Sequence, residues 1–190
     1  WTLDEDQHER RRKLREGWLA KTSQKLMLNN KIRTPVRPAY LPHVMARGLR
    51  DSASDVFRER LAMSQNRGLA RPATNHLTAY VISRFWWDHK QDVEALLNEY
   101  YSNFYGPAAE EMKTFIEHCE ANFTELTTSR EKLNRALQYF DKARQKVADD
   151  SVYGRRLALV DQCLEELRNR NEQLARGRKN VPTVTMLNMA

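Results

Sequence analysis

Apolar residues recur at helical spacing through most of the second half of this chain, and this pattern constrains the fold more than any other feature. Three consecutive stretches place their apolar residues three or four positions apart, which is the spacing of one helix face. Short turns separate the stretches, so neighbouring helices are expected to run antiparallel and form a bundle. The three faces are Val93, Leu96, Leu97, Tyr100, Tyr101 and Phe104; Met112, Phe115, Ile116, Cys119, Phe123 and Leu126; and Leu133, Ala136, Leu137, Phe140 and Val147.

The helix before these stretches and the turns between them are also predicted. Residues 76–87 (HLTAYVISRFWW) are almost entirely apolar, which predicts a helix buried on most sides. Gly106 is suited to end a helix, and Pro107 is suited to the first position of the next one. Thr128 and Glu131 have the spacing of a capping box that starts a further helix.

A last helix is predicted from Val152 to Ala175, with Gly177 placed as its C-terminal stop. Its central positions are separated alternately by four and three residues, which is typical of a coiled-coil seam. Such a seam either belongs to the core of the bundle or forms a self-association contact, and the sequence leaves both open. The seam residues are Tyr153, Leu157, Val160, Leu164, Leu167, Asn171 and Leu174.

The first 74 residues lack this regularity. They predict one long and one short helix, separated by proline-rich or polar stretches without a helical period. The predicted segments are a helix over 4–28, a loop over 29–42 with room for one short extended segment, a helix over 43–50 and an irregular connection over 51–74.

The predicted fold class is therefore mainly α, with an antiparallel helical bundle preceded by an irregular segment. Three parts are expected: a basic helix and irregular segment at 1–74, the bundle at 75–178, and a tail at 179–190. No run of about 18 apolar residues is present, so no membrane-spanning segment is predicted. No signal segment is visible at the first residue, Trp1, and a start other than Met suggests a mature product or a piece of a longer protein.

The net charge of +7 is unevenly placed along the chain. Residues 1–90 contain 18 Lys and Arg against 9 Asp and Glu, whereas residues 91–190 contain 14 against 16. The sharpest basic feature is the run from Arg10 to Arg15, which is a candidate for phosphate binding. No aromatic stacking platform or nucleic-acid motif accompanies it, so we favour a solvated helix face over a nucleic-acid partner.

Few residues are candidates for chemistry. Glu59 lies between Arg58 and Arg60, and adjacent cations keep a carboxylate ionised, as a nucleophile or base requires. His43 and His76 have no Cys, His or Asp at ligand spacing, so we expect packed or capping histidines and no metal site. We expect no cofactor. Cys119 and Cys163 lie on apolar helix faces, and whether they form a disulfide is left open.

The second half of the chain also resembles a known family. The matching blocks are Asn75-His76-Leu77 with Tyr80, Trp87-Asp88, Asp92-Val93, Leu96-Leu97, Tyr105-Gly106-Pro107-Ala108-Ala109 with Met112, Ser151-Val152-Tyr153-Gly154-Arg155-Arg156 and Leu174-Ala175-Arg176-Gly177-Arg178. These blocks, within residues 75–182, resemble the C-terminal part of large bacterial proteins that carry a domain of unknown function. Those proteins are similar to α-glucuronidases and β-hexosaminidases, which have a (β/α)₈ barrel followed by a helical domain.

Residues 1–74 match the same family more loosely. Leu41-Pro42-His43, Ala46-Arg47 and Leu49-Arg50 resemble the segment that leads to the last barrel strands. The family's next feature is a Gly-x-Phe-x-Glu strand end, near the place where barrel enzymes carry their chemistry. This sequence keeps Phe57 and Glu59, but Asp55 replaces the glycine and Arg58 replaces an apolar residue.

The resemblance implies a role in glycoside hydrolysis by a pair of carboxylic acids. It nominates Glu59 as the only catalytic carboxylate, with its partner outside this chain, and it implies an exported parent protein. Residues 1–74 would then be a truncated barrel remnant, and the chain alone is expected to be inactive. Tyr80, Trp86 and Trp87 are candidates for the rim of a carbohydrate site, although we favour core packing for them.

Overall fold

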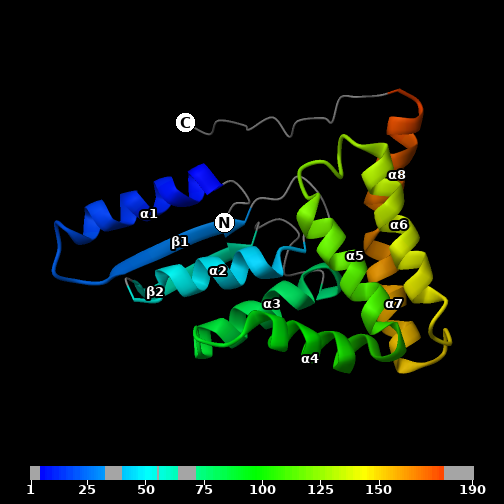
Figure 1. The fold of residues 1–190 in the computed structure, drawn as a ribbon, viewed down its shortest axis with the longest axis horizontal. Helices are drawn as coiled ribbons and strands as arrows, with labels where there is room; N and C mark the ends of the chain where they lie inside the picture. The colour runs from blue at the N-terminus through cyan, green and yellow to red at the C-terminus, as the bar shows by residue number, and fades with distance from the viewer. Residues whose placement is uncertain (1–4, 33–39, 55, 64–71, 178–190) are drawn as a thin grey trace. The chain divides into compact units, whose positions relative to one another are not determined.

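The computed structural model describes residues 5–32, 40–54, 56–63 and 72–177, and it confirms that the chain is mainly helical (Figure 1). The chain divides into two compact units, with the boundary between Asn103 and Phe104. We call the described residues up to Asn103 the α/β unit and those from Phe104 to Gly177 the helical unit. Helix α4 (Val93–Tyr105) spans this boundary, which lies beyond the division at residue 75 expected from sequence.

The α/β unit alternates helices and strands. Strands β1 and β2 pair in parallel, and helix α2 lies between them in the sequence (Figure 1). A parallel pair needs a crossover connection, and α2 provides it here. The elements of the unit are α1 (Glu5–Leu19), β1 (Leu26–Ile32), α2 (Pro42–Ser52), β2 (Val56–Met63), α3 (Pro72–Trp87) and most of α4.

The two strands correct the sequence prediction. The helix predicted over residues 4–28 ends at Leu19, and the chain from Leu26 is strand β1. The connection predicted to be irregular over 51–74 contains β2 and the start of α3. The physical reason is that β1 and β2 stabilise each other by backbone hydrogen bonds between residues about 30 positions apart, and such non-local pairing leaves no clear period in either strand.

The buried apolar side chains of the α/β unit come mainly from its helices. Helices α2 and α3 pack against each other, and the prediction of a largely buried helix over 76–87 is confirmed as far as Phe85. The buried set comprises Tyr40, Leu41, Met45, Ala46, Leu49, Leu77, Val81, Ile82, Phe85, Leu96, Leu97, Tyr100 and Tyr101.

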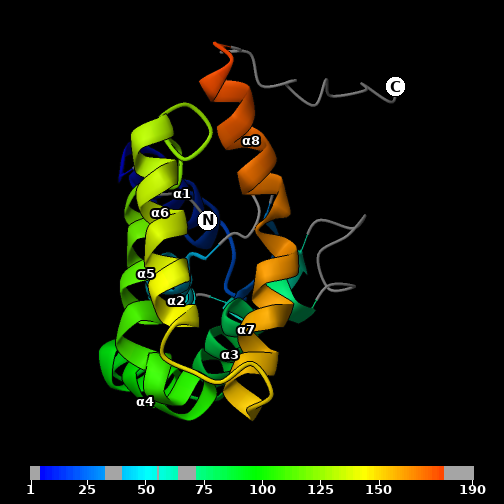
Figure 2. The same cartoon turned by 90° about the vertical axis from the view of Figure 1, so that its right-hand side faces the viewer.

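The helical unit forms the antiparallel bundle expected from sequence. Figure 2 shows α5 and α6 side by side and running in opposite directions, with α7 and α8 running opposite to α6. Ser129, rather than Thr128, caps α6, because its hydroxyl accepts a hydrogen bond from the backbone N–H of Lys132. The elements are η1 (Gly106–Ala108), α5 (Ala109–Ala121), α6 (Arg130–Arg144), α7 (Val152–Cys163) and α8 (Glu165–Ala175).

Two glycines permit tight turns in the helical unit. Gly106 has φ +53°, a left-handed conformation that favours glycine, and a Cβ there would lie 2.5 Å from the ring of Tyr153. Gly154 lies against the chain that precedes α7, and a Cβ there would meet the carbonyl oxygen of Ala148 at 2.2 Å. Gly106 therefore forms the predicted joint after α4, and Gly154 lets the start of α7 approach the turn before it.

The predicted last helix is two helices, because the chain breaks at Leu164 between α7 and α8. Leu157, Val160, Leu164 and Leu167 of the predicted seam are buried, so these side chains belong to the core of the helical unit. Self-association through the seam would require exposing that core. The stop predicted at Gly177 is confirmed by its φ of +73° directly after the helix.

Candidate functional site

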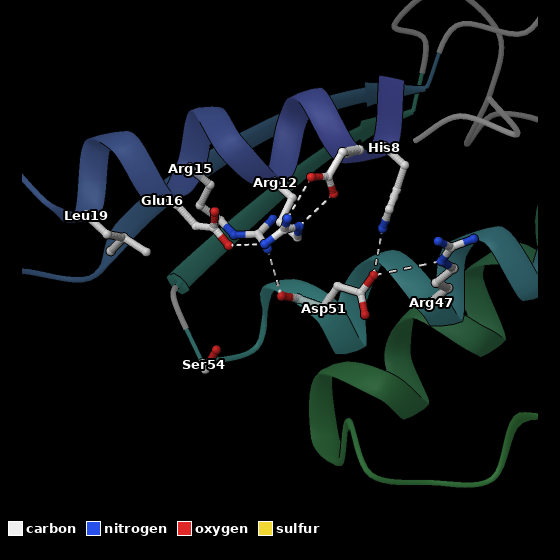
Figure 3. A pocket seen from close by; sticks show the side chains of 9 residues that line it. His8, Arg12, Arg15, Glu16, Leu19, Arg47, Asp51 and Ser54 are labelled. Atoms are coloured by element: carbon white, nitrogen blue, oxygen red, sulfur yellow. Dashed lines mark hydrogen bonds and ion pairs between the residues drawn. The ribbon is translucent and has the colours of Figure 1, made fainter. Parts of the chain in front are cut away.

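An open depression between α1 and α2 is the candidate site that the described part of the α/β unit offers (Figure 3). It has a volume of about 630 Å³ and is lined almost entirely by charged side chains. The lining residues are His8, Glu9, Arg12, Arg15, Glu16, Leu19, Arg47, Asp51 and Ser54. Helix α1 contributes the first six and helix α2 supplies Arg47 and Asp51, so the depression depends on how these two helices meet.

Asp51 is the central residue on the α2 side. Its Oδ2 atom lies 2.7 Å from Nε2 of His8 and 3.9 Å from Nε of Arg47 (Figure 3). Its backbone carbonyl accepts a hydrogen bond of 2.9 Å from Arg15. Asp51 therefore contacts two positions two turns apart on α1 and one position on its own helix.

Arg12 is the central residue on the α1 side. Its guanidinium donates hydrogen bonds of 2.7 and 2.6 Å to the two carboxylate oxygens of Glu9 and a further hydrogen bond to Glu16. The hydrogen bond from Arg12 lowers the pKa of Glu9 to about 2, with help from the charges of Arg12 and Lys13. The same contacts raise the pKa of Arg12 above its usual value.

This arrangement is suited to holding two helices together. Glu9 and Glu16 each contact Arg12, and Asp51 contacts His8 and Arg47, so the carboxylates of the depression are engaged by side chains of the two helices. Within the described residues, no group of three or more His, Cys, Asp or Glu side chains is placed to hold a metal ion. We describe the depression as an ion-paired junction between α1 and α2, hereafter the α1–α2 junction.

Glu59, the nominated carboxylate, lies elsewhere in the unit. It occupies the middle of β2, four residues before the strand ends at Met63, and its backbone pairs with that of Leu28. The structure describes the backbone of Glu59 but not its side chain. Its position is therefore interior to the strand, whereas barrel enzymes place catalytic residues at or beyond the strand end.

The two tryptophans at the end of α3 are exposed, which corrects the preference for core packing. Trp86 is 53% exposed and Trp87 is 91% exposed. Helix α3 begins at Pro72, after β2 has ended, and its 16 residues extend about 24 Å. Trp86 and Trp87 therefore lie at the helix end remote from the end of β2.

Tyr80 and the two histidines have structural contacts. The guanidinium of Arg84 lies 5.6 Å from the centre of the Tyr80 ring, and burial raises the pKa of Tyr80. Nε2 of His43 lies 2.9 Å from Oε1 of Glu94, so His43 links α2 to α4. His76 stacks on Tyr100 with ring centres 6.0 Å apart. These contacts agree with the prediction of packed histidines.

The cysteines are free thiols. Cys119 and Cys163 are both buried and form no disulfide. Burial raises the pKa of the Cys119 thiol well above its usual value, so the reactive thiolate is suppressed.

Sequence reasoning missed the α1–α2 junction. His8 and Asp51 are 43 positions apart, and neither belongs to a motif that signals their contact. The one signal in the sequence is local: Glu9 and Lys13 have the four-residue spacing of a helical ion pair, and Nζ of Lys13 lies 3.5 Å from Oε1 of Glu9.

The fold and the junction define a mainly helical protein that carries a parallel β-α-β unit. Residues 3–117 match the sequence model of the family described as "Domain of unknown function (DUF4838)". This match covers more than half of the chain, and the chain belongs to this family. Comparisons with curated proteins and with solved structures gave no match.

The family match covers the first part of the chain, where the residue-level resemblance was looser, and continues through the matching blocks from Asn75 to Met112. It spans the described α/β unit, continues through η1 and ends at Glu117 within α5. The recognition of a domain of unknown function is therefore confirmed, and the family description itself assigns no activity. Among the helices that the structure describes, none combines the length and apolar character needed to cross a membrane.

Proposed function

We propose that the chain is the C-terminal segment of a glycoside-hydrolase-like protein. The α/β unit is the last part of a (β/α) barrel, and the helical unit is a C-terminal module that supports a carbohydrate site. The chain is not catalytic alone, because most of the barrel and the second carboxylic acid are contributed by residues outside it.

The order of elements in the α/β unit carries this proposal. Helix, strand, helix, strand and helix alternate from α1 to α3, and the two strands are parallel. Parallel strands joined by helices are the repeating unit of α/β barrels and of open α/β sheets. Parallel sheets occur almost only where further strands and covering helices are present, which supports a larger α/β structure around these two strands.

The position of the carbohydrate site follows from the strand direction. In α/β enzymes the ligand lies beyond the carboxyl ends of the strands, which here means beyond Ile32 and Met63. Trp86 and Trp87 lie at the opposite end of α3, so we remove them from the proposed rim. Glu59 remains the nominated carboxylate by resemblance.

Two measurements test the proposal. The isolated chain of 190 residues should give a helical circular dichroism spectrum but release no chromophore from aryl glycosides; turnover by this chain alone would overturn the proposal. In the longest polypeptide encoded by its reading frame, Glu59→Gln should lower aryl-glycoside hydrolysis by about 10²–10⁴-fold, as loss of a general acid or base does. Glu131→Gln, which alters an exposed carboxylate on α6, is the matched control.

A second candidate function is nucleic-acid binding through α1. Arg10 and Arg11 are exposed, which favours it, whereas Arg12 and Lys13 contact Glu9 and are partly neutralised. Retention on DNA should then weaken as the salt concentration rises. The double substitution Arg10→Gln and Arg11→Gln should reduce the slope of log affinity against log salt concentration by about two. Unchanged retention after neutralising residues 10 to 13 excludes this function.

A further inference from the structure

The outward side of helix α1 carries exposed apolar and basic side chains together. Leu14 is 64% exposed and Trp18 is 59% exposed, and Arg10 and Arg11 are exposed as well. At about 100° of rotation per residue, these four positions fall within an arc of about 100° around the helix. The side chains that meet α2, such as His8, lie outside this arc (Figure 3). This side of α1 is therefore separate from the α1–α2 junction.

A further cation lies beside the indole of Trp18. Nζ of Lys21 is 6.0 Å from the centre of the Trp18 ring, a distance suited to a cation–π contact. The backbone N–H of Lys21 donates a hydrogen bond of 3.0 Å to the carbonyl oxygen of Trp18, which holds the two residues together after the helix ends. We call Arg10, Arg11, Leu14, Trp18 and Lys21 the cationic stripe. Its indole corrects the expectation that no aromatic ring accompanies the basic run.

The acids of α1 offset only part of the charge of the cationic stripe. Glu9 and Glu16 both bind Arg12, which lies on another side of the helix. Asp6 is four positions before Arg10, so it borders the stripe and offsets part of its charge. No acid occurs between residues 17 and 25, where the stripe ends. The stripe therefore has an excess of positive charge around an exposed ring.

This combination specifies the chemistry of a ligand. The face of an indole is electronegative and attracts the C–H groups on the face of a sugar ring. Guanidinium and ammonium groups bind carboxylate and sulfate groups by charge-assisted hydrogen bonds. Because Lys21 lies beside the Trp18 ring, a sugar stacked on this ring would bring its anionic substituent close to the ammonium group. A neutral sugar would use the ring but none of the charge.

Resting on the proposed function for the choice of a carbohydrate, we propose that the cationic stripe binds an acidic polysaccharide. Trp18 stacks on one sugar ring, and Leu14 contacts its apolar edge. The three cations of the stripe bind carboxylate or sulfate groups on this ring and its neighbours. Lys21 precedes the start of β1 at Leu26, so the stripe is distinct from the carbohydrate site proposed beyond the carboxyl ends of the strands. It holds the polymer at a second place on the α/β unit.

Two other occupants fit the stripe less well. Proteins that bind single-stranded nucleic acid stack successive bases on several aromatic side chains, whereas Trp18 is the only Phe, Tyr or Trp in residues 5–25. A second copy of the chain would place the cations of one stripe against those of the other, which opposes association.

Calorimetric titration of the 190-residue chain with polygalacturonate tests the stripe. Trp18→Ala should weaken binding about tenfold, whereas Trp18→Phe, which keeps an aromatic ring, should retain most of the affinity. Arg10→Gln with Arg11→Gln should weaken binding and flatten its dependence on salt concentration. Arg130→Gln with Arg135→Gln makes the same charge change at exposed positions of α6 and should alter neither quantity. Circular dichroism checks that every variant folds.

A series of polymers identifies the ligand chemistry. Polygalacturonate carries carboxylates and dextran sulfate carries sulfates, while methyl-esterified polygalacturonate and dextran are their uncharged counterparts. At least one charged polymer should bind about tenfold more tightly than its uncharged counterpart, because only the charged form reaches the cations. The tighter of the two charged polymers identifies the preferred anionic group.

Several results would overturn the proposal. Unchanged binding by Trp18→Ala, or no binding of either charged polymer, excludes the stripe as a carbohydrate surface. Equal binding of polyglutamate would show that the stripe responds to charge alone. Tighter binding of single-stranded oligothymidylate would show that the ligand is a nucleic acid and favour the second candidate function.

The binding result is independent of hydrolysis. If the stripe binds an acidic polysaccharide but the longest polypeptide shows no hydrolysis that depends on Glu59, the proposed function alone is contradicted. If hydrolysis is present and the stripe does not bind, the cationic stripe alone is contradicted.

Discussion

The α/β unit and the helical unit are stabilised in different ways. The helical unit buries its own apolar stripes, with Phe115 and Phe140 in contact at 5.6 Å between ring centres. The α/β unit leaves Leu14, Trp18 and Trp87 exposed, and its first helix is attached to α2 by ion pairs at the surface. We therefore expect the two units to unfold with some independence, because the helical unit encloses its own core whereas the α/β unit leaves more of its large apolar side chains exposed.

The largest expected effect comes from truncating the core of the helical unit. Phe140→Ala should lower the free energy of unfolding by about 3–5 kcal/mol, because a large buried ring is replaced by a cavity. All four tryptophans lie in residues 1–103, so fluorescence follows the α/β unit while circular dichroism follows both units. In urea unfolding, the decrease in the free energy of unfolding should be larger when followed by circular dichroism than when followed by fluorescence.

Leu159→Ala is the control for this substitution, because Leu159 is half exposed on α7. Its effect should stay within about 0.5 kcal/mol, as for most surface changes. Equal shifts of both signals in Phe140→Ala would contradict the independence of the two units.

The joint at Gly106 should be the next most sensitive position. Gly106→Ala forces a left-handed residue and also pushes a Cβ against the Tyr153 ring. The expected loss is about 2–4 kcal/mol, from about 1–2 for the backbone and the rest for overpacking. Thermal unfolding of the chain measures it.

Gly177→Ala separates the two contributions at Gly106. Gly177 also has a left-handed φ, and a Cβ there would meet no atom within 4 Å, so only the backbone cost of about 1–2 kcal/mol remains. Tyr153→Ala should partly rescue Gly106→Ala. If Gly106→Ala and Gly177→Ala are equally damaging, the close approach of Tyr153 has no energetic importance.

A smaller effect is expected in the α/β unit when Asp51 is changed. Asp51→Asn weakens the contacts to His8 and Arg47 at the α1–α2 junction. Surface ion pairs contribute at most about 1 kcal/mol, so global stability should fall by no more than that. The clearer sign should be faster amide hydrogen exchange within α1. The control variant Asp141→Asn on α6 should leave exchange within α1 unchanged. Unchanged exchange in α1 would mean that the junction does not hold the helix.

The smallest effect concerns the pH response of α1. Glu9 has its pKa lowered from 4.5 to about 2 by Arg12, so the ionised form is favoured in the folded helix. The stabilisation from ionised Glu9 is fully present above the pKa that Glu9 has in the unfolded chain. It is lost as the pH falls through the pKa of Glu9 in the folded chain. Helicity measured by circular dichroism should therefore decline between about pH 4.5 and 2. Glu9→Gln should remove that part of the titration, and identical curves for both proteins would contradict the pairing.

The same contrast explains which features were predictable from sequence. Helical stripes such as Met112, Phe115 and Ile116 are local patterns, and all three residues are buried as predicted. Residue spacing missed strand β2, which only the family resemblance indicated, because its residues include Arg58, Glu59 and Arg60 and its stability depends on pairing with a distant strand. Local spacing therefore predicted most helices of both units and missed the two strands of the α/β unit.

The candidate site was harder to predict for a related reason. Contacts such as His8 with Asp51 join residues that no motif links. Trp86 and Trp87 continue an apolar helix in sequence, yet they extend beyond the part of α3 that is buried. The sequence shows how apolar a segment is, but the neighbours that would cover each side of it are set by the tertiary fold.

Gly154 has a consequence for evolution. A side chain at this position would collide with the backbone at Ala148 and Asp149, which cannot move aside as a flexible side chain can. Ser151 fixes the same turn, because its hydroxyl accepts a hydrogen bond from the backbone N–H of Gly154. Homologues that retain this turn should therefore keep the Ser-x-x-Gly pair even where the apolar residues around it have diverged. The pair is a compact marker for recognising the helical unit in distant sequences.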